Sequence, residues 1–113
     1  TRAAAVAVVD TTGTQLSGFD SSRPATAVLS SVVSSVVSVV LLAANVARRQ
    51  AIILNDGNKT LFVAFSATAS LTAFTVRIDS QQAWVGVIDG YTGVISGIWS
   101  AANGSARITE VTT

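Results

Sequence analysis

Residues 28–42 read VLSSVVSSVVSVVLL, and this stretch decides the fold class. Its spacing alone is ambiguous, because apolar pairs at 32/33, 36/37 and 39/40 also suit one face of a helix. Valine, however, loses side-chain freedom at every turn of a helix and packs well on a pleated strand. The seven valines of this stretch therefore predict a strand, a serine-rich bend near residues 34–35 and a second strand.

The same stretch lies within an uncharged run from Pro24 to Ala47, which is long enough to raise the question of a transmembrane helix. Five serines interrupt the apolar residues between 28 and 42, and the β-branched content is very high. Neither feature is typical of a membrane-spanning helix. We therefore expect no contact with a membrane.

Short strands separated by turn signals continue to the C-terminus, at the spacing typical of a β-sandwich or barrel. Residues 55–58, NDGN, predict a hairpin turn because Asn and Gly accept positive φ at little cost. Phe74, Val76 and Ile78 alternate with polar residues, as in a half-buried antiparallel strand. Strands are expected near residues 26–33, 36–42, 50–54, 60–66, 72–78, 83–88, 93–99 and 106–111.

The predicted fold class is therefore all-β: a single antiparallel β-sandwich, jelly-roll-like or Ig-like, with an N-terminal arm. A chain of 113 residues is long enough for one domain and too short for two. Residues 25–113 are assigned to the sandwich. Residues 1–24 hold one short apolar segment followed by turn-forming residues, so they are expected to form an arm or a peripheral hairpin, with a frayed terminus as the alternative.

The composition points to an assembling protein. Half of the residues are hydrophobic but only 12% are charged, which is about half the usual share of a globular domain. Too few charges are present to coat the surface of an ordinary monomer. The apolar surface is therefore expected to be covered in an oligomer or a larger assembly, or masked by the abundant Ser and Thr.

The residue inventory argues against an enzyme. The chain has no Cys and no His, so it lacks thiolate and imidazole metal ligands and the commonest general base. Its acidic residues lie mostly in predicted turns, and its sole lysine, Lys59, follows the NDGN turn. A carboxylate pair formed in space remains the enzymatic alternative. The seven basic residues are scattered, so nucleic-acid binding is not expected either, and no cofactor is predicted.

The aromatic residues leave two interpretations open. Trp84, Tyr91 and Trp99 could form a platform on which sugars stack, or they could anchor the core and subunit contacts. Ile95, Ile98 and Trp99 do not alternate strictly, which favours a contact with a neighbouring subunit for one of them. Arg48 and Arg49 could steer an acidic partner or simply be solvated. The candidate interface residues, chosen by hydrophobicity and position, are Val6, Val8, Phe19, Arg48, Arg49, Trp84, Tyr91 and Trp99.

From about residue 36 onward the order of features resembles a family of small all-β structural proteins of tailed-bacteriophage virions, of the capsid-decoration and head-fibre type. The segments that carry the resemblance are residues 39–45 with Arg48, then 52–57, 61–63, 67–70, 74–76, 91–99 and 102–110. The sequence departs from the pattern at residues 79–84, where a glycine-bearing turn and a tyrosine are expected.

The resemblance implies a non-enzymatic virion component assembled in the host cytoplasm. The first expectation is a capsid decoration or cement protein, a homo-oligomer and most simply a trimer, that contacts the major capsid protein. A head-fibre base, a neck component or a tail component is the second expectation. A carbohydrate-binding module for host attachment is the third, and it requires exposed, roughly coplanar aromatic rings.

Overall fold

A computed structural model describes residues 26–86 and 90–113 of the chain, and in these ranges every regular element is a β-strand. The predicted arm at 1–24, with Val6, Val8 and Phe19, lies outside the described residues. The prediction of an all-β chain is confirmed. The strands are β2 (Thr26–Val33), β3 (Val39–Leu42), β4 (Arg48–Asp56), β5 (Leu61–Ala64), β6 (Val76–Ile78), β7 (Ala83–Gly86), β8 (Ile95–Trp99) and β9 (Ser105–Thr112).

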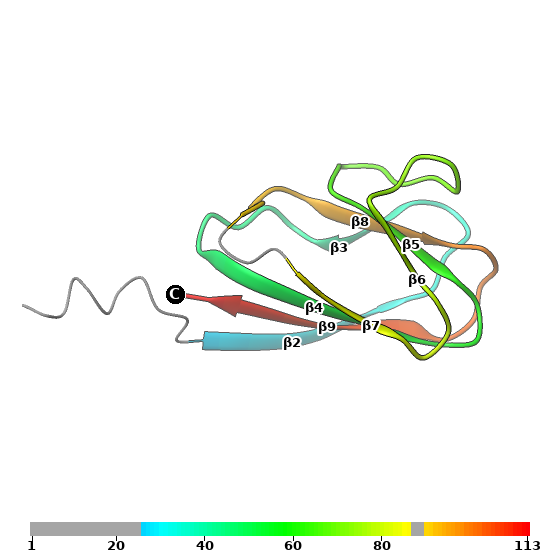
Figure 1. Cartoon of the computed structure of the whole chain (residues 1–113), viewed down its shortest axis with the longest axis horizontal. Coiled ribbons are helices and arrows are strands. Elements are labelled where there is room, and N and C mark those ends of the chain that lie inside the picture. The colour runs from blue at the N-terminus through cyan, green and yellow to red at the C-terminus, as the bar shows by residue number, and fades with distance from the viewer. Residues whose placement is uncertain (1–25, 87–89) are drawn as a thin grey trace, which may run out of the picture.

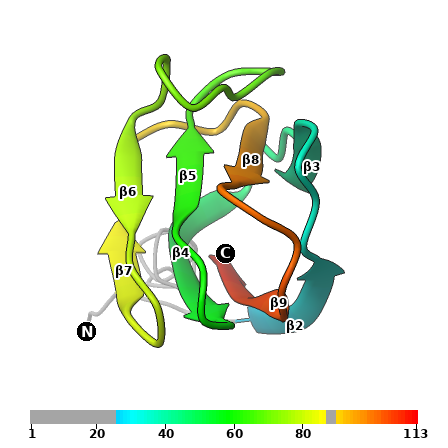
Figure 2. The same ribbon diagram turned by 90° about the vertical axis from the view of Figure 1, so that its right-hand side faces the viewer.

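The strands form two antiparallel sheets that face each other as a sandwich (Figure 1). The first sheet has the order β2-β9-β4-β7 and the second the order β3-β8-β5-β6. Figure 2 shows β3 and β2 at one lateral side of the sandwich and β6 and β7 at the other. The predicted sandwich is therefore confirmed.

The strand pairs are nested along the chain. The first described strand pairs with the last, β2 with β9, and then β3 pairs with β8, β4 with β7 and β5 with β6. Pairing of β9 with β4 and of β8 with β5 completes the two sheets. An eight-stranded double sheet wound in this way is a jelly roll, which decides between the two predicted topologies.

Each expected strand range overlaps one observed strand, but the hairpin expected at residues 55–58 is wrong. Those residues connect β4 to β5, which lie in different sheets. They lie against the β8–β9 connection, where the Asn58 N–H donates to Asn103 Oδ1 at 2.9 Å. Gly104, at φ +72°, lies against the Asp56 carbonyl so closely that an added Cβ would clash with it. The glycines here allow two inter-sheet connections to touch.

The core lies between the sheets and is built from alternate residues of the long strands. In β4, Ala51 and Ile53 are completely buried while Ile52 and Leu54 are half-buried on the outer face. Trp99 in β8 is 1% exposed and is the largest of the fully buried side chains. The main core cluster comprises Leu41, Leu42, Ala51, Ile53, Leu61, Val63, Ile78, Ile95, Trp99, Ala106 and Ile108.

Residues 79–82, before β7, form a turn that contains no glycine. Gln81 takes a positive φ of 62°, a conformation that glycine adopts more readily. The turn closes through the bond from the Gln82 N–H to the Asp79 carbonyl, and the Gln81 N–H donates to the Asn55 carbonyl. Just before it, β6 begins at Val76, so Phe74 precedes the strand and meets Phe62 edge-on at a centroid distance of 4.8 Å.

Candidate interaction surface

The described part of the uncharged run, residues 26–47, contributes one lateral side of the sandwich. It supplies β2 and β3, which end the two sheets on the same side (Figure 2). The sequence prediction of two strands around a serine-rich bend is confirmed, since the chain leaves β2 at Val33 and enters β3 at Val39. A stretch with the hydropathy of a membrane segment is thus folded into two edge strands.

Large apolar side chains are exposed along this side. Of the ten large hydrophobic residues found exposed in the described part of the chain, seven lie between residues 28 and 46. Leu29 is 77% exposed and Val33 is 75% exposed. We call the following residues the valine side: Val28, Leu29, Val33, Val36, Val37 and Val40. Concentrated exposure of large apolar side chains is a feature of interaction sites on protein surfaces.

The opposite lateral side, formed by β6 and β7, is different in chemistry. Arg77 and Asp79 form a solvent-exposed ion pair there, with 3.5 Å between Nε and Oδ1. Gln81 and Gln82 are exposed in the adjoining turn, and Val85 is a single large hydrophobic residue on β7 at 54% exposure. The apolar character is therefore concentrated on one side of the sandwich.

The valine side continues onto the outer face of the first sheet. An open hollow of about 440 Å³ lies over β2, β9 and β4. Leu29, Ile52 and Leu54 contribute apolar walls, and Arg107 stands at the hollow with its guanidinium 3.0 Å from Asp56. A protein partner could place one or two apolar side chains in a depression of this size.

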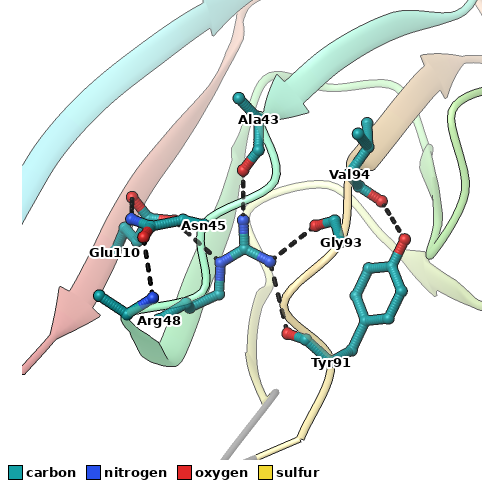
Figure 3. Close-up of polar contacts among 8 residues, drawn as sticks. Ala43, Asn45, Arg48, Tyr91, Gly93, Val94 and Glu110 are labelled. Carbon is teal, nitrogen blue, oxygen red and sulfur yellow. Dashed lines mark hydrogen bonds and ion pairs between the residues drawn. The ribbon is translucent and has the colours of Figure 1, made fainter.

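The side chain of Arg48 is buried at one end of the sandwich and bonds to several segments there (Figure 3). Its side chain is fully buried, and its Nε donates to Glu110 Oε2 at 2.8 Å. Nη2 donates to the Ala43 carbonyl at 2.6 Å, and Nη1 donates to the carbonyls of Gly93 and Tyr91. One guanidinium thus joins β4 and β9 to the β3–β4 and β7–β8 connections.

This placement removes two predicted residues from any surface. Arg48 is 2% exposed and Trp99 is 1% exposed, so neither side chain can reach a partner in this conformation. Arg49 is half-buried at the start of β4. The irregular apolar spacing of residues 95–99 arises because β8 is a central strand: Ile95, Ser96, Gly97 and Trp99 are all buried.

Trp84 and Tyr91 form an internal aromatic cluster with Phe65. Phe65 stacks on Tyr91 at 4.8 Å with an interplanar angle of 6°, and it meets Trp84 edge-on at 5.6 Å. The Trp84 indole lies against Gly86, and the Tyr91 hydroxyl donates to the Val94 carbonyl at 2.6 Å. All three rings are half-buried against the core. The three rings therefore contact one another and the core while each remains partly exposed.

The described residues offer few elements of reactive chemistry. No three of their His, Cys, Asp or Glu side chains lie close enough together to hold a metal ion. Among the same residues, no helix has the length and apolar character needed to cross a membrane.

Comparison of the chain with models of known protein families, with curated proteins and with solved structures gives no match. The sequence analysis did not select any residue of the valine side as an interface candidate. The signal that could have found them was the uncharged run itself, whose valine-rich character indicates a packing surface without singling out residues.

Proposed function

We propose that the protein is a non-enzymatic structural component of a tailed-bacteriophage particle, most specifically a capsid decoration protein that stabilises the head through subunit contacts. The observation that carries this proposal is the valine side, an uncharged lateral surface with large exposed apolar side chains. The resemblance of residues 36–113 to small virion proteins supports the phage setting. The proposed partners are the major capsid protein and further copies of this chain.

The physical basis is burial of this surface against neighbours. Complete burial of one Val or Leu side chain contributes about 1.5–3 kcal/mol before the entropic costs of association. A few such side chains give a contact of ordinary strength, but a shell presents the contact many times. A head-fibre base, neck component or tail component would use the same surface, so the assembly partner distinguishes these stations.

The test adds the isolated protein to expanded, undecorated phage heads and measures bound copies per capsid subunit and the resistance of the heads to heat or chelator. Binding at a fixed ratio with increased resistance is the expected result. Failure to bind heads overturns the decoration role and directs the search to fibre and tail proteins.

A matched pair of variants tests the surface. Val33→Asp and Val85→Asp place the same charge on opposite edge strands of the same sheet. We expect Val33→Asp to weaken head binding by at least about tenfold, because the carboxylate loses its hydration in the contact. Val85→Asp should bind as the wild type does. Equal binding by both variants would overturn the assignment of the valine side.

A further inference from the structure

We propose that β2 pairs edge to edge with β2 of a second copy, antiparallel and about a two-fold axis. The pairing would join two four-stranded sheets into one sheet of eight strands (4 + 4). This pairing rests on the proposed function, in which the valine side is an interaction surface. It names a second copy of the chain as the partner of that surface.

Among the described residues, β2 lies at a sheet edge and lacks the features that protect such edges. Proteins block edge strands by making them short, bulged or charged, because an unprotected edge pairs with other chains. β3 has four residues and a register shift between Val40 and Leu42, β6 has three residues and carries Arg77, and β7 has four residues. β2 has eight residues, pairs with β9 without any register shift and carries no charge.

β2 is exposed on both faces of the sheet. Seven of its eight residues are exposed, and the apolar ones point alternately to the two faces of the sheet. Val28 lies opposite Glu110, which faces the interior, whereas Leu29 lies opposite Thr109 on the outer face. A ligand on one face of the sheet would leave the apolar side chains that point to the other face uncovered. A strand that continues the sheet covers the edge and extends both rows.

The sequence of β2 is compatible with antiparallel pairing to a second copy of itself. An antiparallel pair centred on Ser30 places Val28 opposite Val32 of the second copy and Ala27 opposite Val33. Leu29 then lies opposite Ser31 of the second copy, and Ser30 lies opposite Ser30 of the second copy. No like charges meet, because the strand has none. Apolar cross-strand neighbours of this kind stabilise antiparallel pairs, and two-fold dimers are the commonest homo-oligomers.

The pairing also fixes the size of the assembly. A strand that pairs with its own copy about a two-fold axis closes at two subunits, because the described residues of each subunit provide one such edge. The trimer expected from the sequence would need a different contact. The mass of the particle in solution therefore separates the two possibilities.

The full-length chain has no cysteine, so single cysteine variants report on the pairing without background. Residues directly opposite in an antiparallel pair have Cα atoms about 4.5–5.5 Å apart, which a disulfide can span. We expect Ser30→Cys to give a disulfide-linked dimer under mild oxidation. In the same register two copies of residue 31 are diagonal neighbours about 7–8 Å apart, so Ser31→Cys should cross-link poorly. Val85→Cys, on the opposite edge of the sheet, should not cross-link.

Light scattering supplies an independent readout. The wild type should show twice the 11.5 kDa chain mass, Val33→Asp should shift towards the monomer with a dissociation constant raised at least about tenfold, and Val85→Asp should not shift. A monomeric or trimeric wild type would overturn the proposal, as would equal cross-linking at positions 30, 31 and 85. A monomeric wild type whose β2 amides are protected from hydrogen exchange would also overturn the proposal. Another segment of the same chain would then be the partner of β2.

The two proposals fail separately. Cross-linked dimers that do not bind heads would leave the pairing standing and overturn the decoration role. Heads decorated by a chain that does not cross-link at position 30 would overturn the pairing and support the decoration role.

Discussion

The guanidinium of Arg48 and the carboxylate of Glu110 meet inside the domain at 2.8 Å, although 62 positions separate them in the sequence. Asn45 supports the carboxylate from the other side, donating through Nδ2 to Glu110 Oε1 at 3.3 Å. The same asparagine accepts from the Ala47 N–H, and its own N–H donates to the Thr92 carbonyl. The ion pair is thus the centre of a network that fixes one end of the sandwich.

Replacing Arg48 should be costly. Arg48→Met keeps most of the side-chain volume but leaves Glu110 without its cation and several carbonyls without a donor. We expect the free energy of unfolding to fall by about 3–5 kcal/mol in urea denaturation. Arg107→Met removes the exposed ion pair with Asp56 and should cost less than about 1 kcal/mol. Equal losses for the two variants would contradict the structural role of Arg48.

Arg48→Lys tests geometry separately from charge. A lysine keeps the positive charge but cannot direct donors along the three directions that the guanidinium uses. We expect this variant to recover only part of the stability that Arg48→Met loses. Full recovery would mean that charge alone matters at this position.

Gly104→Ala should destabilise the fold by about 2 kcal/mol or more. The positive φ of Gly104 costs an L-residue roughly 1–2 kcal/mol, and the added Cβ would also meet the Asp56 backbone. Gly97→Ala is the comparison: its Cβ would lie 2.8 Å from Leu41 Cδ1, the flexible end of a side chain. Thermal unfolding should show a larger loss for Gly104→Ala. The reverse order would contradict the tight contact between the two connections.

Trp84→Ala tests the aromatic cluster. Because the indole packs on Gly86 and meets Phe65, we expect a loss of about 2 kcal/mol in unfolding free energy, below the value for a fully buried tryptophan. Phe74→Ala, in the more exposed pair with Phe62, should cost about half as much. A glycan array should show no binding to the wild type. Glycan binding lost in a Trp84→Ala variant of unchanged stability would revive the carbohydrate interpretation.

Leu29→Lys should improve solubility without harming the fold. At 77% exposure Leu29 contributes little to its own domain, so the free energy of unfolding at low protein concentration should change by less than about 0.5 kcal/mol. A lysine on an edge strand also discourages edge pairing. Salt-precipitation measurements should show higher solubility. Leu54→Lys, at a half-buried position, should destabilise the domain more than Leu29→Lys does.

Local sequence patterns were sufficient to locate the strands but not to pair them. The valine-rich stretch and the Gly- and Asn-containing turns placed all eight described strands, because side-chain shape and turn chemistry act within a few residues. The NDGN signal at 55–58 was misread as a hairpin, since a turn that joins two strands of one sheet resembles a turn that crosses between sheets. Whether the chain after β4 returns to the same sheet depends on β9, which pairs with β4 and comes about fifty residues later in the sequence.

The candidate site was predicted less well than the fold. Trp99 was considered for a subunit contact because tryptophan is common at interfaces, but a central strand buried on both faces removes the alternation by which an inward residue is recognised. Arg48 was weighed as a surface charge, because nothing near it in sequence indicates Glu110 as its partner. Both misplacements arose from contacts that only the complete fold creates.

The nested order of strand pairs has a consequence during synthesis. β2 is the first described strand to leave the ribosome, and its partner β9 is the last. Thr26 can therefore pair with Thr112 only after the last described strand has been synthesised. Folds dominated by such distant pairings fold slowly, in roughly milliseconds to seconds. Throughout translation the valine-rich strand is therefore an unpaired segment prone to aggregation. Its two serines, Ser30 and Ser31, would help to keep the strand hydrated until β9 is synthesised, and so would serve the nascent chain as well as the finished one.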